Sequence, residues 1–124
     1  MKTINTETAP AAVGPYSQAV ISGNMVFTAG QIPIDPQTNE LIDGDVAAQT
    51  EQVLQNLSAV LKAADSSLEN AVKVTVFIKD MNDFATINSI YEKYFTNRPA
   101  RSTVEVARLP KDVLVEMDVV AEVG

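Results

Sequence analysis

The side chains of residues 71–79 alternate in a way that limits what this chain can fold into. Apolar side chains occupy every second position, namely Val72, Val74, Val76 and Ile78. Successive side chains of a strand point to opposite faces, so this spacing predicts a strand with one well-buried face. The opposite face would carry Lys73, Thr75, Phe77 and Lys79.

The remaining periodic segments supply the rest of the fold. Apolar residues recur at helical spacing over 46–64, after the candidate N-cap Asp45, and again over 83–95. Short strand-like runs at 18–22 and 25–29 flank Gly23-Asn24, a typical hairpin turn. Further strands are expected at 102–107 and 113–123, and residues 30–44 have the composition of a loop. The order β-β-α-β-α-β-β predicts an α+β fold, a mixed sheet with two helices on one face, in a single domain spanning 1–124.

Two helices on one face leave the other face of the sheet without cover from the chain itself. That face is expected to hold Phe77, Leu114 and Val120 among polar residues. A half-apolar uncovered face predicts self-association. A solvated face, which antiparallel sheets tolerate, is the alternative.

Composition excludes several classes of chemistry. The 124 residues include no cysteine and no histidine, so a thiol nucleophile, a histidine base and the thiolate and imidazole ligands of metals are absent, and no metal or cofactor is expected. The net charge of −7 disfavours nucleic acid as a partner. No apolar run approaches the length needed to span a membrane, and the first residues do not form a secretory signal, so the expected location is cytoplasmic.

Pairing of the last two strands would gather charged side chains on the uncovered face. If 102–107 and 113–123 form a hairpin, their core residues must oppose each other, with Val104 opposite Val115. Arg101 would then face Asp118, and Thr103 would face Glu116. This arrangement has two interpretations. Arg101 forms a cross-strand ion pair, or it clamps a small carboxylate while Glu116 handles water or protons.

Several motifs decide between these interpretations, because together and in this order they are highly specific. They are AAVGPYSQ at 11–18, GNMVFTAGQIP at 23–33, VFIKDMNDF at 76–84, PARSTVEV at 99–106 and LPKD at 109–112. Along nearly its whole length the chain resembles the Rid family, the reactive intermediate (enamine/imine) deaminases of the RidA and YjgF type.

The resemblance implies a chorismate-mutase-like fold and a homotrimer, with the sheets facing a central barrel and active sites in the clefts between subunits. It also implies hydrolysis of 2-aminoacrylate, 2-iminobutyrate and similar acids to 2-keto acids and ammonia. The family's carboxylate-binding arginine corresponds to Arg101 and its water-activating glutamate to Glu116. Residues with supporting roles in substrate binding correspond to Tyr16, Ala29, Gly30, Asn88 and Thr103.

The chain departs from the family pattern at three places. Familiar bacterial members carry serine at the position of Ala29 and cysteine at that of Thr103. The loop between Phe95 and Pro99 is shorter than in some members. These differences bear on the rate, the substrate range and the rim of the cleft.

Two other functions remain open at the level of sequence. A protein that binds small acids without turnover, and thereby regulates a biosynthetic enzyme, would use the same arginine. RNA binding or cleavage rests only on the basic cluster Arg98, Arg101, Arg108 and Lys111, against an acidic chain without a histidine pair.

Overall fold

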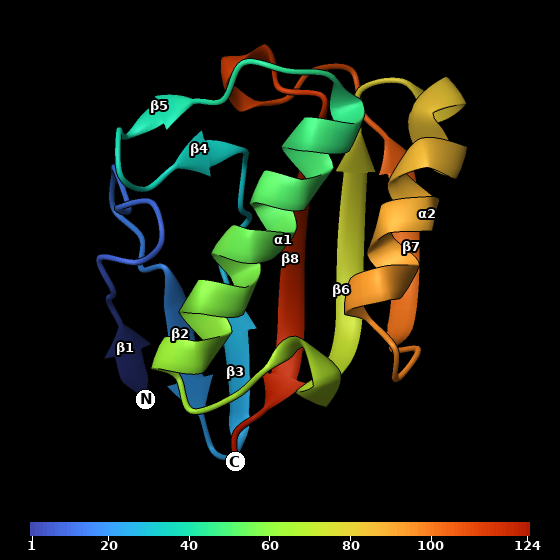
Figure 1. Ribbon diagram of the computed structural model, residues 1–124. Coiled ribbons are helices and arrows are strands. Elements are labelled where there is room, and N and C mark those ends of the chain that lie inside the picture. The colour runs from blue at the N-terminus through green and yellow to red at the C-terminus, as the bar shows by residue number, and fades with distance from the viewer.

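The sheet of this protein is built from six strands in the order β1-β2-β3-β8-β6-β7 (Figure 1). The structure is a computed structural model that describes residues 1–124. The strands are β1 (Lys2–Ile4), β2 (Ala19–Ser22), β3 (Met25–Thr28), β6 (Ala71–Ile78), β7 (Ala100–Glu105) and β8 (Val115–Glu122). The β6–β7 pair is parallel, and the other neighbours in this sheet are antiparallel. A separate two-stranded sheet, β4 (Ile34–Asp35) and β5 (Glu40–Leu41), lies within the segment expected to be a loop.

The two helices form where the sequence predicts them. Helix α1 (Val46–Ala63) begins after Asp45, whose side chain accepts a hydrogen bond of 3.0 Å from the backbone N–H of Ala48. This N-cap satisfies one of the backbone donors left free at the start of a helix. Helix α2 (Phe84–Tyr94) follows a short 3-10 turn (Met81–Asp83). Neither helix is long and apolar enough to cross a membrane.

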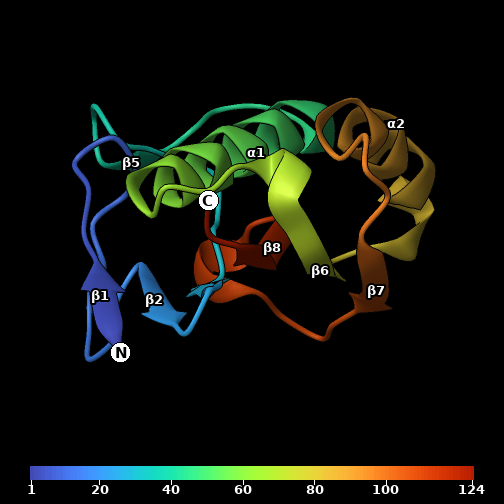
Figure 2. The ribbon, with the colours of Figure 1, turned by 90° about the horizontal axis from the view of Figure 1, so that it is seen from below.

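Both helices cover the same face of the sheet, which confirms the α+β architecture (Figure 2). The core lies between these two layers. Its largest fully buried side chains include Leu54, Leu57 and Leu61 of α1, Ile78 of β6 and Met117 of β8. The opposite face of the sheet, called the open face below, has no element of the chain over it and leaves Phe27 46% exposed.

The alternation of β6 is confirmed from Val74 onward and wrong at its start. Val74, Val76 and Ile78 are fully buried, whereas Val72 is 41% exposed. An irregularity between Ala71 and Lys73 shifts the pairing with β8 and turns Ala71 inward instead. A bulge of this kind adds one residue to a strand and reverses the alternation before it.

The predicted hairpin of the last two strands is also wrong. Strand β8 lies between β3 and β6, so it does not touch β7 as a sheet neighbour. Strand β7 instead pairs in parallel with β6 and lies at the edge of the sheet. Helix α2 connects the two strands, so the three elements form a βαβ unit. The long apolar alternation of β8 explains why β8 and not β7 is central, because a central position buries its apolar side chains completely. These are Val115, Met117, Val119 and Ala121. At the edge, Val104 is 42% exposed rather than in the core.

Candidate active site

Arg101 lies on the helix-covered face of the sheet and not on the open face. In the parallel β6–β7 register Arg101 pairs with Val74, which points into the core beneath the helices. Paired residues of neighbouring strands direct their side chains to the same face. Thr103 pairs with Val76 and shares that face. The expected contacts of Arg101 with Asp118 and of Thr103 with Glu116 are therefore absent, because β6 lies between β7 and β8.

Three side chains from one face of α2 hold the Arg101 guanidinium. Arg101 Nη1 donates a hydrogen bond of 2.7 Å to Asn88 Oδ1. The guanidinium carbon lies 4.8 Å from the ring centroid of Tyr91 and 5.4 Å from that of Phe84. Distances below about 6 Å are within the range of cation–π attraction. Residues 84, 88 and 91 are spaced by four and three positions, so they are neighbours on the helix surface.

The remaining donors of Arg101 have no carboxylate partner. The ion pair in this structure joins Arg108 and Asp112, at 3.8 Å, and does not involve Arg101. The cross-strand ion pair expected as one alternative is thus not formed. A guanidinium carries five N–H donors in a planar fork, and Asn88 engages one nitrogen of it. Arg101 is therefore oriented and still able to bind an anion.

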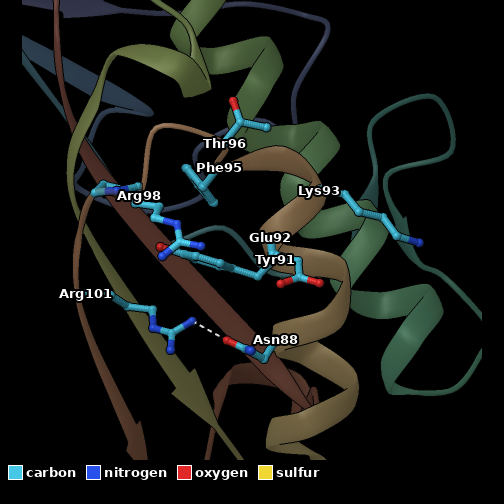
Figure 3. A pocket seen from close by; sticks show the side chains of 9 residues that line it. Asn88, Tyr91, Glu92, Lys93, Phe95, Thr96, Arg98 and Arg101 are labelled. Atoms are coloured by element: carbon cyan, nitrogen blue, oxygen red, sulfur yellow. Dashed lines mark hydrogen bonds between the residues drawn. The ribbon is translucent and has the colours of Figure 1, made fainter.

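Arg101 opens onto a groove of about 810 Å³, called the Arg101 groove below (Figure 3). It lies between the C-terminal half of α2 and the segment that leads into β7. Its wall consists of Asn88, Tyr91, Glu92, Lys93, Phe95, Thr96, Arg98, Pro99 and Arg101. The groove thus contains Arg101 and Asn88 of the residues singled out in the sequence.

Two hydroxyl groups close to Arg101 are buried without a hydrogen-bond partner. They are the Tyr91 hydroxyl and Thr103 Oγ1. Burial raises the pKa of Tyr91, and the positive charge of Arg101 partly opposes that rise. A buried polar atom without a partner costs about 1–3 kcal/mol, so a water molecule or a bound ligand that pairs with either hydroxyl would be stabilised there.

Glu116 lies on the open face, near the centre of the sheet. It pairs with Phe77 of β6, whose side chain also points away from the helices. Burial raises the pKa of the Glu116 carboxyl above its ordinary value, and the charge of the neighbouring Asp118 raises it further. Asp118 behaves similarly: burial raises its pKa, while Thr75 and Lys73 act in the opposite direction. Arg101 does not contribute to this shift in the pKa of Glu116, because it lies on the other face of the sheet.

Gly30 leaves the space in which the Glu116 carboxylate lies. The segment after β3 forms a bridge to β8 through Gln31 and Met117, which brings residue 30 next to residue 116. A Cβ atom on residue 30 would lie 2.0 Å from Glu116 Oε2, far inside contact distance. Glycine therefore permits the close approach of the carboxylate, and a Cβ atom on this residue would displace the end of the Glu116 side chain.

Tyr16 and Gly30 line a second, smaller cavity of about 280 Å³. Tyr16 is 53% exposed, and its hydroxyl accepts a hydrogen bond of 3.3 Å from the Val13 N–H. The Ala29 N–H donates to the Gln18 carbonyl at 2.9 Å, so residue 29 is held next to Gly30 by the backbone. Tyr16, Ala29, Gly30 and Glu116 therefore form a group separate from Arg101.

The predicted site residues thus fall into two groups. The Arg101 group consists of Arg101, Asn88 and Thr103 on the helix-covered face, and the Glu116 group consists of Glu116, Gly30, Ala29 and Tyr16. The Arg101 groove includes no member of the Glu116 group. Sequence reasoning missed Phe84 and Tyr91 as neighbours of Arg101. Their spacing from Asn88 was the available signal, but aromatic residues at such spacing are also typical of a helix core.

Comparison with known proteins identifies the family. The family model described as Endoribonuclease L-PSP matches residues 6–123. A RutC family protein of Pyrococcus horikoshii is 56% identical over 97% of this chain and 96% of its own length. The 2-iminobutanoate/2-iminopropanoate deaminase of Escherichia coli is likewise 56% identical, over 97% of this chain and 96% of that protein.

Solved structures agree with the sequence comparison. The crystal structure of Escherichia coli TdcF with bound serine superposes with a TM-score of 0.94, at 48% identity and with all of both chains covered. The YjgF gene product of the same organism superposes with a TM-score of 0.93 at 55% identity, over 98% of each chain. The chain therefore belongs to the Ribonuc_L-PSP family, the YjgF/RutC/Rid proteins, as its motifs indicate.

Proposed function

We propose that this protein hydrolyses small 2-imino acids and their enamine tautomers to 2-keto acids and ammonia. The observation that carries the proposal is Arg101, a guanidinium fixed by Asn88 and two aromatic rings whose other donors are free. The names of relatives at 55–56% identity support the same reaction.

Arg101 is assigned the substrate carboxylate. A planar guanidinium binds a carboxylate through two parallel hydrogen bonds, which fixes both position and orientation. Because Asn88, Phe84 and Tyr91 already hold the side chain, little conformational freedom is lost on binding. Orientation of this kind accelerates the reaction of a short-lived acid without any covalent step.

Glu116 is assigned the proton transfers. The oxygen of water adds to C2 of the imine, and both hydrogens of the water end on the nitrogen, which leaves as ammonia with the electrons of the C–N bond. A carboxyl group with a raised pKa exchanges protons more readily near neutral pH than an ordinary glutamate. No oxidant, reductant or metal is needed for the balance of this reaction.

The two assignments require a second copy of the chain. Arg101 and Glu116 lie on opposite faces of one sheet, so a substrate held by Arg101 cannot reach Glu116 of the same chain. We therefore assign the cleft to the contact between subunits of a homotrimer, with Arg101 from one copy and Glu116 from its neighbour. The half-apolar open face with the exposed Phe27 supports association. The serine bound to TdcF supports recognition of a small amino acid skeleton in the family.

A coupled assay tests the proposal. A threonine or serine dehydratase generates the imine, and formation of keto acid is followed with and without this protein. Faster formation of keto acid is the expected result. Binding of 2-ketobutyrate without faster formation of keto acid would contradict the enzyme and favour a regulator that binds small acids.

A further inference from the structure

A second arginine, Arg98, lines the same groove as Arg101. The turn that precedes β7 places it there. The Arg98 N–H donates to the Phe95 carbonyl at 3.4 Å, and Arg98 adopts a left-handed φ of 54° immediately before Pro99. Figure 3 shows the Arg98 and Arg101 side chains both extending from this segment toward α2, beside the Tyr91 ring. The short turn between Phe95 and Pro99 therefore brings a second guanidinium to the groove.

The groove is positively charged in an otherwise acidic protein. Its charged side chains are Arg98, Arg101 and a single carboxylate, Glu92, whereas the Lys93 side chain points away from Arg101 (Figure 3) and the whole chain has a net charge of −7. The ion pair of the structure lies elsewhere, so these cations are not neutralised by a carboxylate of the chain at ion-pair distance. One monocarboxylate ligand on Arg101 would leave Arg98 without an anion.

The spacing and size of the groove accommodate a longer acid. Three residue steps separate positions 98 and 101, so their Cα atoms lie at most about 11 Å apart. At that distance, two flexible arginine side chains can contact the two ends of one short molecule. The volume of about 810 Å³ exceeds what a four-carbon acid fills.

We propose that Arg98 is a specificity-determining residue that selects acids with a second carboxylate, that is, 2-imino acids derived from acidic amino acids. The proposal rests on the proposed function, because it assigns the first carboxylate to Arg101. Arg98 binds the distal carboxylate at the rim, where the ligand would otherwise meet only solvent.

Calorimetric titration of the assembled protein with two stable keto acids tests this specificity. The probes are 2-ketoglutarate, with two carboxylates, and 2-ketobutyrate, with one. An exposed charge-assisted contact predicts about tenfold tighter binding of the dicarboxylate to the wild type. In Arg98→Gln this preference should fall to near unity. The matched control Arg108→Gln removes an arginine outside the groove and should keep the preference.

Several results would overturn the inference: equal affinities in the wild type, a preference that survives Arg98→Gln, an equal loss in Arg108→Gln, or no binding of either acid. Hydrolysis of 2-iminobutyrate, measured on the same samples, separates the two proposals. Hydrolysis without a dicarboxylate preference leaves the function intact and removes only the role of Arg98. A preference for the dicarboxylate without hydrolysis would support the role of Arg98 and contradict the proposed hydrolytic activity.

Discussion

The Arg101 group and the Glu116 group differ in how the fold supports them. Arg101 lies on an edge strand and depends on helix α2 for its orientation, through one hydrogen bond and two aromatic rings. Glu116 lies on a central strand, where backbone pairing on both sides fixes its position and burial raises its pKa. In the proposed reaction the edge strand provides an accessible cation that binds the substrate, and the central strand provides a partly buried carboxyl group that transfers protons. Each group lacks what the other has, so neither is a complete site.

Removing the titratable proton of the Glu116 group should have the largest effect. Glu116→Gln keeps the size and hydrogen bonding of the side chain, but it should lower the rate of imine hydrolysis by about 10²–10⁴-fold. Binding of 2-ketobutyrate should persist, because the carboxylate is held by Arg101. The coupled assay and calorimetry measure the two quantities. Unchanged acceleration would assign the activation of water to another group.

Altering the cation of the Arg101 group should have the next largest effect. Arg101→Lys keeps the charge but loses the planar fork and its fit between the two rings, so hydrolysis should fall by about 10²-fold with weaker binding of 2-ketobutyrate. Circular dichroism should show an unchanged fold, because the residue is exposed. Full activity in Arg101→Lys would contradict the bidentate clamp.

The contact between Gly30 and Glu116 gives an intermediate effect. Gly30→Ala places a methyl group where Glu116 Oε2 now lies, so the carboxylate must move. Hydrolysis should fall by about tenfold or more, as expected for a displaced catalytic group. Gly23→Ala, at the hairpin turn, strains the backbone at a φ of 62° but has no atom within 4 Å of the added Cβ, so it is a stringent control for a general loss of stability. An equal loss of activity in both variants would count against a role for the Gly30 contact.

The smallest effect concerns stability and depends on pH. Because the folded pKa of Glu116 is raised, the native state retains a proton that the unfolded chain releases earlier as pH rises. Stability therefore falls as pH rises from the ordinary pKa through the raised one. Glu116→Gln avoids this loss, so its melting temperature should exceed that of the wild type by a few degrees at neutral pH and by nothing at pH values below the ordinary pKa. A difference independent of pH would contradict a raised pKa.

The sequence predicted most elements because their patterns are local. The alternation in β6 and β8, the N-cap at Asp45 and the turn at Gly23-Asn24 depend on neighbouring residues alone. The pairing of β7 could not be predicted in this way. A hairpin and a parallel crossover both satisfy the alternation of 102–107, and the choice depends on which strand gains most from the centre of the sheet.

The same limit applies to the candidate site. Arg101, Asn88, Gly30 and Glu116 were identified from motifs, but the face on which each lies depends on strand order. Pairing of 102–107 with 113–123 would put Arg101 and Glu116 on one face of the same chain, whereas in the structure β6 lies between their strands. The contacts of Phe84 and Tyr91 with Arg101 follow from the packing of α2 on β7, which no local pattern specifies.

In the proposed site, Arg101 of one subunit acts together with Glu116 of another. Co-assembly of Arg101→Lys and Glu116→Gln chains, distinguished by two tags and purified as mixed oligomers, tests this arrangement directly. Each variant alone should be nearly inactive. In every mixed trimer one of the three sites receives both native residues, so the activity of the purified mixed trimers should return to about a third of the wild-type value. Mixed oligomers no more active than the two separate variants would contradict a site shared between subunits.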